Sequence, residues 1–311
     1  MRQELGEVLR AYGGKNERVV VLDADVSSST MTKLFQEAYP DRFFNVGIAE
    51  AGMVDTAVGL ALGGWIPFVS AFAAMLCYRA FEQIRTCVAY NRVPVKLLAG
   101  YAGVSDYKDG PTHHSVFDLA AMRAMPNMTV VTAADGGEMK ELIPAVAEYD
   151  GPVYLRVSRA DIPYTDMSGE PIAIGKGRII ENGADITLIA HGVPLYRTLQ
   201  AREILAERRV DARVVEMHTL KPLDAELVRR CARETRGVVT VEEHSVIGGL
   251  YGAVAETLIG ETAVPVVPVG IRDSFTCTGP SPESLWDAVG LAPQAIADAG
   301  LAALEKAKRR S

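Results

Sequence analysis

Short apolar runs alternate with longer amphipathic stretches along nearly the whole chain, and this alternation constrains the fold more than any other feature. Strands separated by helices of this length pair in parallel, with helices on both faces of the sheet. Runs in the first half predict strands at Val19–Asp23, Ile66–Ser70, Val95–Gly100, Thr129–Thr132 and Val153–Val157. The stretches between them predict helices at Arg2–Tyr12, Met31–Ala38, Ala49–Leu62, Tyr78–Tyr90 and Gly137–Tyr149. Asp135 is a candidate cap for the last helix, with Glu138 three residues further on.

The second half shows the same alternation of apolar runs and amphipathic stretches, which predicts a second domain of the same class. Its strands are expected at Ile186–Ala190, Ala212–Glu216, Val238–Glu242 and Val264–Val269, and its helices begin near Pro194, Asp224 and Gly248. The connector at 162–177 contains two prolines and three glycines, which is typical of a domain boundary. We therefore expect two three-layer α/β/α domains, at 1–165 and 176–311, with ligands at the carboxyl ends of their mainly parallel strands.

Charge and composition exclude several classes of function. A formal net charge of −7 argues against nucleic acid or an anionic membrane as the main partner. The apolar stretch from Ala51 to Leu76 is interrupted by Asp55, two glycines and Pro67, so it predicts a buried helix and a strand rather than a membrane span. The first residues are polar and helical in pattern, so we expect no signal peptide and a cytoplasmic location. Four cysteines lie far apart without metal-ligand spacing, which indicates reduced thiols.

The segment Phe43–Val54, FFNVGIAEAGMV, places Glu50 in the first turn of a helix among apolar residues. A glutamate near a helix N-terminus can be there for the helix dipole alone. An exposed first turn would be more polar than this one, however. A carboxyl group in an apolar pocket can stay protonated near neutral pH and donate a hydrogen bond.

Two further segments place polar groups after predicted strands. DGPTHHS brings Asp109, His113 and His114 within a loop that follows the third strand, and YLRVSR ends a strand with Arg156 and Arg159. A loop histidine is often only solvated, and an arginine at a strand end can be a surface ion-pair residue. Together, these groups favour one site that binds a ligand with a carboxylate or phosphate.

These segments, with GGWIPFVSAF, EMHTLKPLD and VVTVEEHSVIGGLYGAVAE, occur in an order that resembles one family. They are similar to the pyrimidine-binding and C-terminal domains of transketolases and of the related deoxyxylulose-phosphate synthases. The resemblance extends over about Val19–Leu291. It implies a subunit of a thiamine-diphosphate-dependent transketolase, which passes a two-carbon ketol unit from a ketose to an aldose.

The resemblance also implies residue roles. Glu50 matches the glutamate that hydrogen-bonds the cofactor's aminopyrimidine and promotes removal of the thiazolium proton. The ring is expected to stack at or near Phe72, Met75 and Tyr78, although Met75 replaces an aromatic residue common at its position.

For the substrate, the resemblance assigns His113 to donor-sugar oxygens, Asp109 to a donor hydroxyl group, and Arg159, with Ser29 as a weaker candidate, to a phosphate. Tyr101 stands where many full-length transketolases have a phosphate-contacting histidine, and this departure puts a standard sugar phosphate in doubt.

The family's diphosphate and Mg²⁺ site is a Gly-Asp-Gly followed by an Asn on an N-terminal domain, and no Gly-Asp-Gly occurs in this sequence. No metal ligand is therefore assigned to the chain. We expect an N-terminal transketolase subunit to supply these ligands, in a heterotetramer of two copies of each chain.

Three other interpretations remain open. The β subunit of a 2-oxoacid dehydrogenase has the same two domains and glutamate, but Asp109, His113 and the EMHTLKPLD run favour a transketolase. A deoxyxylulose-phosphate synthase activity is favoured by the pair Leu155 and Arg156. A non-catalytic scaffold is a third. The glycines after Glu242, Glu243 and His244 lack dinucleotide-loop spacing, so a structural and dimer-forming role is favoured there.

Overall fold

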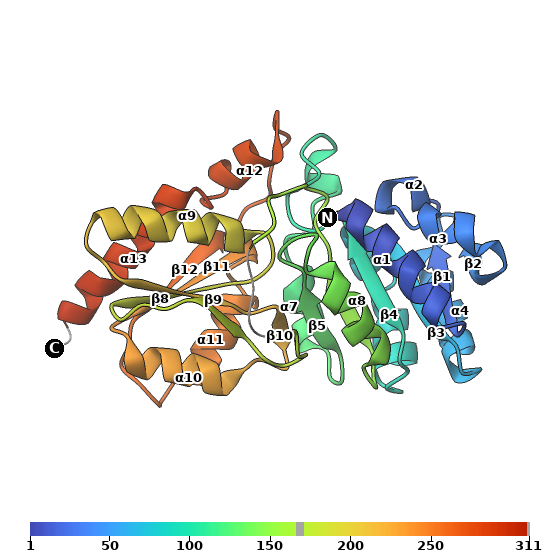
Figure 1. Ribbon diagram of the computed structural model, residues 1–311, viewed down its shortest axis with the longest axis horizontal. Coiled ribbons are helices and arrows are strands. Elements are labelled where there is room, and N and C mark those ends of the chain that lie inside the picture. Colours follow the sequence, from blue (N-terminus) through green and yellow to red (C-terminus); the bar gives the residue numbers. More distant parts are fainter. Residues whose placement is uncertain (166–170, 310–311) are drawn as a thin grey trace.

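The computed structural model describes residues 1–165 and 171–309, and arranges them around two sheets that lie side by side along the long axis of the molecule (Figure 1). The predicted connector at 162–177 falls partly outside the described residues. No helix in the described ranges is both long enough and apolar enough to span a bilayer.

The first sheet has seven strands in the order β10-β5-β6-β4-β3-β1-β2, and all of its pairs are parallel except β10 with β5. Its strands are β1 (Val19–Asp23), β2 (Phe43–Asn45), β3 (Ile66–Phe72), β4 (Lys96–Gly100), β5 (Thr129–Thr132), β6 (Val153–Arg156) and β10 (Thr219–Lys221). Because its strands are buried, most read as continuous apolar runs rather than as alternating ones.

Helices cover both faces of this sheet. Successive strand residues point to opposite faces, so Val19 and Val21 pack on one side while Val20 and Leu22 pack on the other. The first side is covered by α1 (Arg2–Lys15), α3 (Lys33–Ala38) and α8 (Met139–Glu148). The second is covered by α4 (Glu50–Leu62), α5 (Ala73–Arg79), α6 (Phe81–Gln83), the π-helical turn Ile84–Ala89 and α7 (Asp118–Ala124).

The second sheet has five strands in the order β12-β11-β8-β9-β7, of which β7 is antiparallel to β9. Its strands are β7 (Arg178–Glu181), β8 (Ile186–Ala190), β9 (Ala212–Glu216), β11 (Val238–Ser245) and β12 (Val266–Ile271). One face carries α9 (Pro194–Glu207) and α13 (Pro293–Lys308), and the other carries α10 (Ala225–Glu234) and α11 (Leu250–Leu258), as Figure 1 shows. The short α12 (Pro282–Ala288) precedes α13. The predicted α/β class with mainly parallel sheets is confirmed.

Several predicted boundaries were wrong. The helix expected at Met31–Ala38 begins two residues later, at Lys33, because Met31 adopts a left-handed conformation (φ 66°) that ends α2 (Ser27–Thr30). The helical stretch expected to begin at Tyr78 begins at Ala73 and breaks at Ala80. Asp135 accepts a hydrogen bond from the backbone of Glu138, but α8 begins only at Met139. The short strands β2, β7 and β10 were missed.

The two halves share their packing. Strand β10 belongs to the second half of the chain but extends the first sheet, where its Thr219 pairs with Val131 of β5. Both apolar clusters of the core contain residues of both sheets. The loop after β4 also lies against the second half, where Glu243 accepts a hydrogen bond from Val104.

Candidate active site

Glu50 is the first residue of α4 and is 6% exposed. The preceding turn contains Gly47 at φ +72°, a conformation that favours glycine. The Glu50 carboxylate accepts a hydrogen bond from Nη1 of Arg79, at 2.9 Å, and the Arg79 side chain is half exposed at the end of α5. The position in the first helical turn is as expected. The surroundings differ from the apolar pocket that the sequence suggested, because a cation from another helix reaches the carboxylate.

Helix α5 forms part of the wall of a cavity of about 390 Å³, and Arg79, the partner of Glu50, is one of the residues that line it. Met75, Tyr78 and Arg79 line it from this helix, and Tyr78 stacks on Phe117 with ring centroids 4.4 Å apart. Burial raises the pKa of Tyr78, so its hydroxyl group stays protonated. The lining residues are Ala74, Met75, Tyr78, Arg79, Pro111, Thr112, His113, His114, Val116, Phe117, Phe275 and Thr276. Phe275 and Thr276 come from the second half, and no sequence motif had indicated them.

The loop after β4 supplies the opposite wall. His113 lines the cavity, and its Nδ1 lies 3.0 Å from the hydroxyl group of Thr112. His114 is buried and lies between the Thr276 hydroxyl group and the backbone oxygen of Asp106. Burial lowers the pKa of His114, which favours its neutral form. Both adjacent histidines line the cavity, but His113 is half-buried, whereas His114 is buried and contacts two other parts of the chain.

Asp109, the predicted sugar ligand, is exposed in the same loop, whereas Asp106 is buried. Sequence reasoning missed Asp106, because a lone aspartate in a polar loop carries no local sign of burial. Burial, and after it the neighbouring carboxyl group of Asp109, raise the pKa of Asp106 to about 6. The guanidinium group of Arg159 lies 3.9 Å away and opposes this rise.

Two arginine side chains, those of Arg2 and Arg159, lie next to Tyr101, which is not one of the residues that line the cavity. The Tyr101 ring stacks on Phe72 with centroids 4.2 Å apart, and the Arg159 guanidinium lies 5.5 Å from the Tyr101 centroid. Arg2 lies 5.4 Å from the same centroid and donates to the Tyr101 hydroxyl group and to the backbone oxygen of Ser29. The buried Nε atoms of both arginines have no hydrogen-bond partner among the described residues. Two guanidinium groups at one aromatic ring are suited to an anion.

The structure thus brings together most of the predicted residues. Met75, Tyr78 and His113 line one cavity, and Glu50 touches it through Arg79. Phe72 connects the cavity to the Tyr101 group, since its ring lies 6.0 Å from that of His113. Arg2 was missed because its contact with Tyr101 spans 99 residues and has no local pattern.

Comparison with known proteins identifies the family of the chain. The family model "Transketolase, pyrimidine binding domain" matches residues 1–165, and "Transketolase, C-terminal domain" matches residues 175–296. The "Putative transketolase C-terminal section" of Methanocaldococcus jannaschii is 44% identical over 92% of this chain and 90% of its own length. A 6-deoxy-6-sulfo-D-fructose transketolase subunit of Clostridium sp. is 38% identical over 88% of this chain and 85% of its own.

Among solved structures, a split-gene transketolase described as an inactive β4 tetramer superposes with a TM-score of 0.89 and 41% identity, and covers 98% of this chain and 97% of its own. The likeness therefore extends over both halves, at levels of identity that establish common descent. This chain belongs to the transketolase family and has the two domains of a split transketolase's C-terminal subunit.

Proposed function

We propose that this chain, together with a separate N-terminal subunit, transfers a two-carbon ketol unit from a ketose to an aldose with thiamine diphosphate and Mg²⁺. The observation that carries the proposal is the buried carboxyl group of Glu50, held at the first residue of α4 beside a cavity lined by Met75 and Tyr78. A buried carboxyl group beside a cavity can exchange a proton with a heterocycle that reaches it from there.

The residues present fit the pyrimidine end of the cofactor. The stacked rings of Tyr78 and Phe117 and the flexible side chain of Met75 offer an apolar surface to a planar ring. Glu50 would hold the ring by one hydrogen bond. When bound, thiamine diphosphate supplies the nucleophilic carbon and the electron sink that carbon–carbon bond cleavage requires.

Glu50 must change partners for this role. In the chain alone its carboxylate accepts from Arg79, whereas donation to a ring nitrogen needs a protonated carboxyl group. Arg79 is half exposed, so its side chain can turn away when the cavity is filled. His113, which lines the same cavity, would orient oxygens of the sugar.

The far end of the sugar is proposed to carry an anion. Arg2 and Arg159 flank Tyr101, and each keeps a buried Nε without a partner among the described residues. The related subunit from Clostridium is named for a sulfonated sugar, which also ends in an anion. A tyrosine between two arginines thus offers an anion site that needs no histidine at position 101.

The partner is proposed to supply the diphosphate and Mg²⁺ ligands, because no Gly-Asp-Gly occurs in these 311 residues. Large apolar side chains are exposed near the cavity and at the start of α4, namely Phe44, Ile48, Phe117 and Phe275. Such a surface favours burial by another chain. We propose a heterotetramer of two copies of each subunit.

Replacing Glu50 tests the proposal. In the complex reconstituted with the N-terminal subunit, Glu50→Gln should lower turnover of a ketose donor with an aldose acceptor by at least about 100-fold, because the amide cannot exchange the proton. Glu37→Gln on the exposed face of α3 is the control and should retain activity. Unchanged turnover with Glu50→Gln would favour a scaffold role. Turnover by this chain without a partner would contradict the proposed division of the site.

A further inference from the structure

The loop at residues 101–117, here called the substrate loop, carries Tyr101, Asp106 and His113 of the proposed site. Its base is closed by a pair of backbone hydrogen bonds, each 3.1 Å, between Gly103 and Ser115. A closed base keeps the two ends of the loop together, but it does not determine where the loop lies on the protein. The contacts that do so come largely from the second half of the chain.

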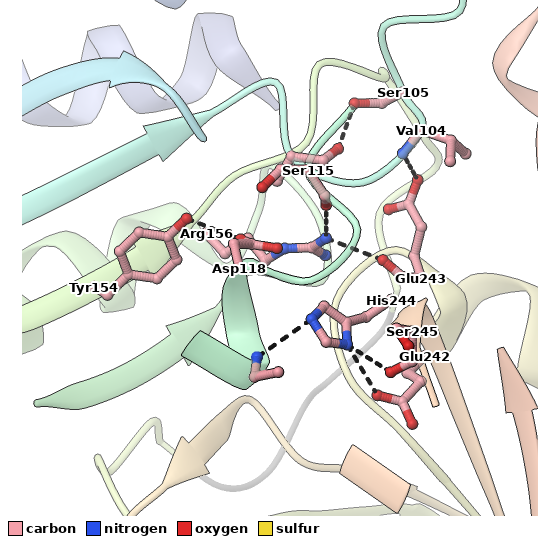
Figure 2. A network of polar contacts seen from close by, with 12 residues as sticks. Val104, Ser105, Ser115, Asp118, Tyr154, Arg156, Glu242, Glu243, His244 and Ser245 are labelled. Carbon is pink, nitrogen blue, oxygen red and sulfur yellow. Dashed lines mark hydrogen bonds and ion pairs between the residues drawn. The ribbon is translucent and has the colours of Figure 1, made fainter. Parts of the chain in front are cut away.

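Glu243 of β11 reaches the base of the substrate loop. Its Oε1 accepts hydrogen bonds from the backbone of Val104, at 2.9 Å, and from the indole of Trp286, at 2.7 Å. Figure 2 shows the carboxylate pointing at the Val104 amide. Gly103 has φ +68°, and a Cβ there would lie 2.2 Å from the Glu243 Cδ. Glycine at 103 therefore allows the carboxylate to approach the backbone closely.

Arg156 connects Ser115, on the other side of the loop's base, to Glu243. Its Nη2 donates to the backbone oxygens of Ser115, at 2.7 Å, and of Glu243, at 3.0 Å, and its Nε pairs with Asp118 (Figure 2). All three charged side chains are buried. The buried guanidinium group is therefore satisfied by the loop, by α7 and by β11 at once.

The tip of the substrate loop is held from a third place. The hydroxyl group of Thr276, in the loop between β12 and α12, lies 2.5 Å from Nδ1 of His114, and the backbone of Gly279 donates to the oxygen of Tyr107. The other ring nitrogen of His114, Nε2, contacts the backbone oxygen of Asp106. The Thr276 hydroxyl group therefore holds the ring of His114, the residue next to His113.

We propose that Glu243 and Thr276 are positioning residues through which the second half of the chain holds the substrate loop in its sugar-binding conformation. This inference rests on the proposed function. Binding residues on a loop need supporting contacts to keep their geometry, and here those contacts span 139 residues for Glu243 and 162 for Thr276. The second half therefore acts in substrate binding through its contacts with the substrate loop.

A matched pair at Thr276 tests the effect on binding. In the reconstituted complex, Thr276→Val should raise the KM for the ketose donor by about tenfold, since His114 loses its partner. Thr276→Ser keeps the hydroxyl group and should restore the KM. A KM that is equal in the two variants would overturn the proposal.

A second pair of variants, at Glu243, tests the positioning role without a measurement of turnover. In the isolated chain, Glu243→Ala should speed amide hydrogen exchange in residues 101–117 by about tenfold, while β8 exchanges as in the parent protein. Glu243→Gln should protect the loop, because its amide oxygen can accept the same two hydrogen bonds. Loop exchange that is unaffected by Glu243→Ala would overturn the positioning role. If the parent complex fails to turn over any ketose, the proposed function fails, and the exchange experiment still decides whether Glu243 holds the loop.

Discussion

Asp106 and Asp109 place two carboxyl groups near the cation of Arg159, and only Asp106 is buried. The pKa of Asp106 is about 6, with burial as the largest cause and the Asp109 carboxyl group as the next. The charge of the loop at its buried side therefore changes in mildly acidic solution. Because this carboxyl group is harder to ionise in the folded chain than in the unfolded one, it links stability to pH.

Replacing Asp109 should expose this link. Between about pH 4 and pH 6, the folded chain retains a proton on Asp106 that the unfolded chain has released, so stability falls as pH rises through this window. Asp109→Asn removes part of the cause and should raise the free energy of unfolding at pH 7 by about 1 kcal/mol, with a gain that shrinks toward pH 4. Urea unfolding at several pH values measures this. A gain that is the same at pH 4 and pH 7 would contradict this prediction. Asp55→Asn, at an exposed position of α4, is the control.

At the scale of elements, the short strand β10 connects the two halves. It extends the first sheet antiparallel to β5, and the ammonium group of its Lys221 donates to the backbone oxygens of Arg123 and Met125 at the end of α7. A cation is favourable at the C-terminus of a helix, where carbonyl groups lack partners. Burial and the nearby charge of Arg123 lower the pKa of Lys221, and its hydrogen bonds to the carbonyl groups favour the charged form.

Removal of this cation should weaken the junction. Lys221→Met keeps the apolar stem but leaves two carbonyl groups unsatisfied, so the free energy of unfolding should fall by about 1–2 kcal/mol. Lys140→Met, on the exposed side of α8, is the matched control and should change it by less than about 0.5 kcal/mol. Chemical denaturation compares the two. Equal losses in both variants would show that the carbonyl contacts contribute nothing.

At the scale of the whole molecule, one buried ion cluster joins the halves. Arg178 of β7 donates to Glu138, at the start of α8, and to Glu216 of β9. Burial, and then Glu216, raise the pKa of Glu138 well above its usual value. Burial also acts to raise that of Glu216, but hydrogen bonds and the charge of Arg178 lower it to about 2. Glu138 is therefore the harder of the two carboxyl groups to ionise. Ligand atoms of Glu138, Glu216 and His218 lie within 4.8 Å of one another, but Arg178 already supplies the positive charge there.

Loss of Arg178 should be costly and pH-dependent. Arg178→Met leaves two buried carboxyl groups without their cation, and should lower the free energy of unfolding by about 3–5 kcal/mol at pH 8. Both folded-state pKa values would then exceed the unfolded ones, so the loss should be smaller at pH 5, where protonation neutralises the pair. Urea unfolding at the two pH values provides the measurement. Arg230→Met, at an exposed position of α10, is the control. A loss independent of pH would contradict this account.

The alternation of short apolar runs with amphipathic stretches determined the α/β class and most strand positions by itself. A buried strand of β-branched residues such as Val19–Asp23 carries its burial in its own composition. The place of Glu50 in the first turn of a helix could also be predicted locally, because the helix pattern begins within its own segment. These features depend on neighbours within a few residues, and a linear pattern contains that information.

The tertiary structure alone decided the contacts that complete the site. Arg79 meets Glu50 across 29 residues, Arg2 meets Tyr101 across 99, and Glu243 meets Val104 across 139. Such contacts depend on how sheets twist, how strands are ordered and how loops close, and none of these leaves a periodic trace in the residues that meet. Strand β10 is the extreme case: only three residues long, it joins a sheet formed by the other half of the chain.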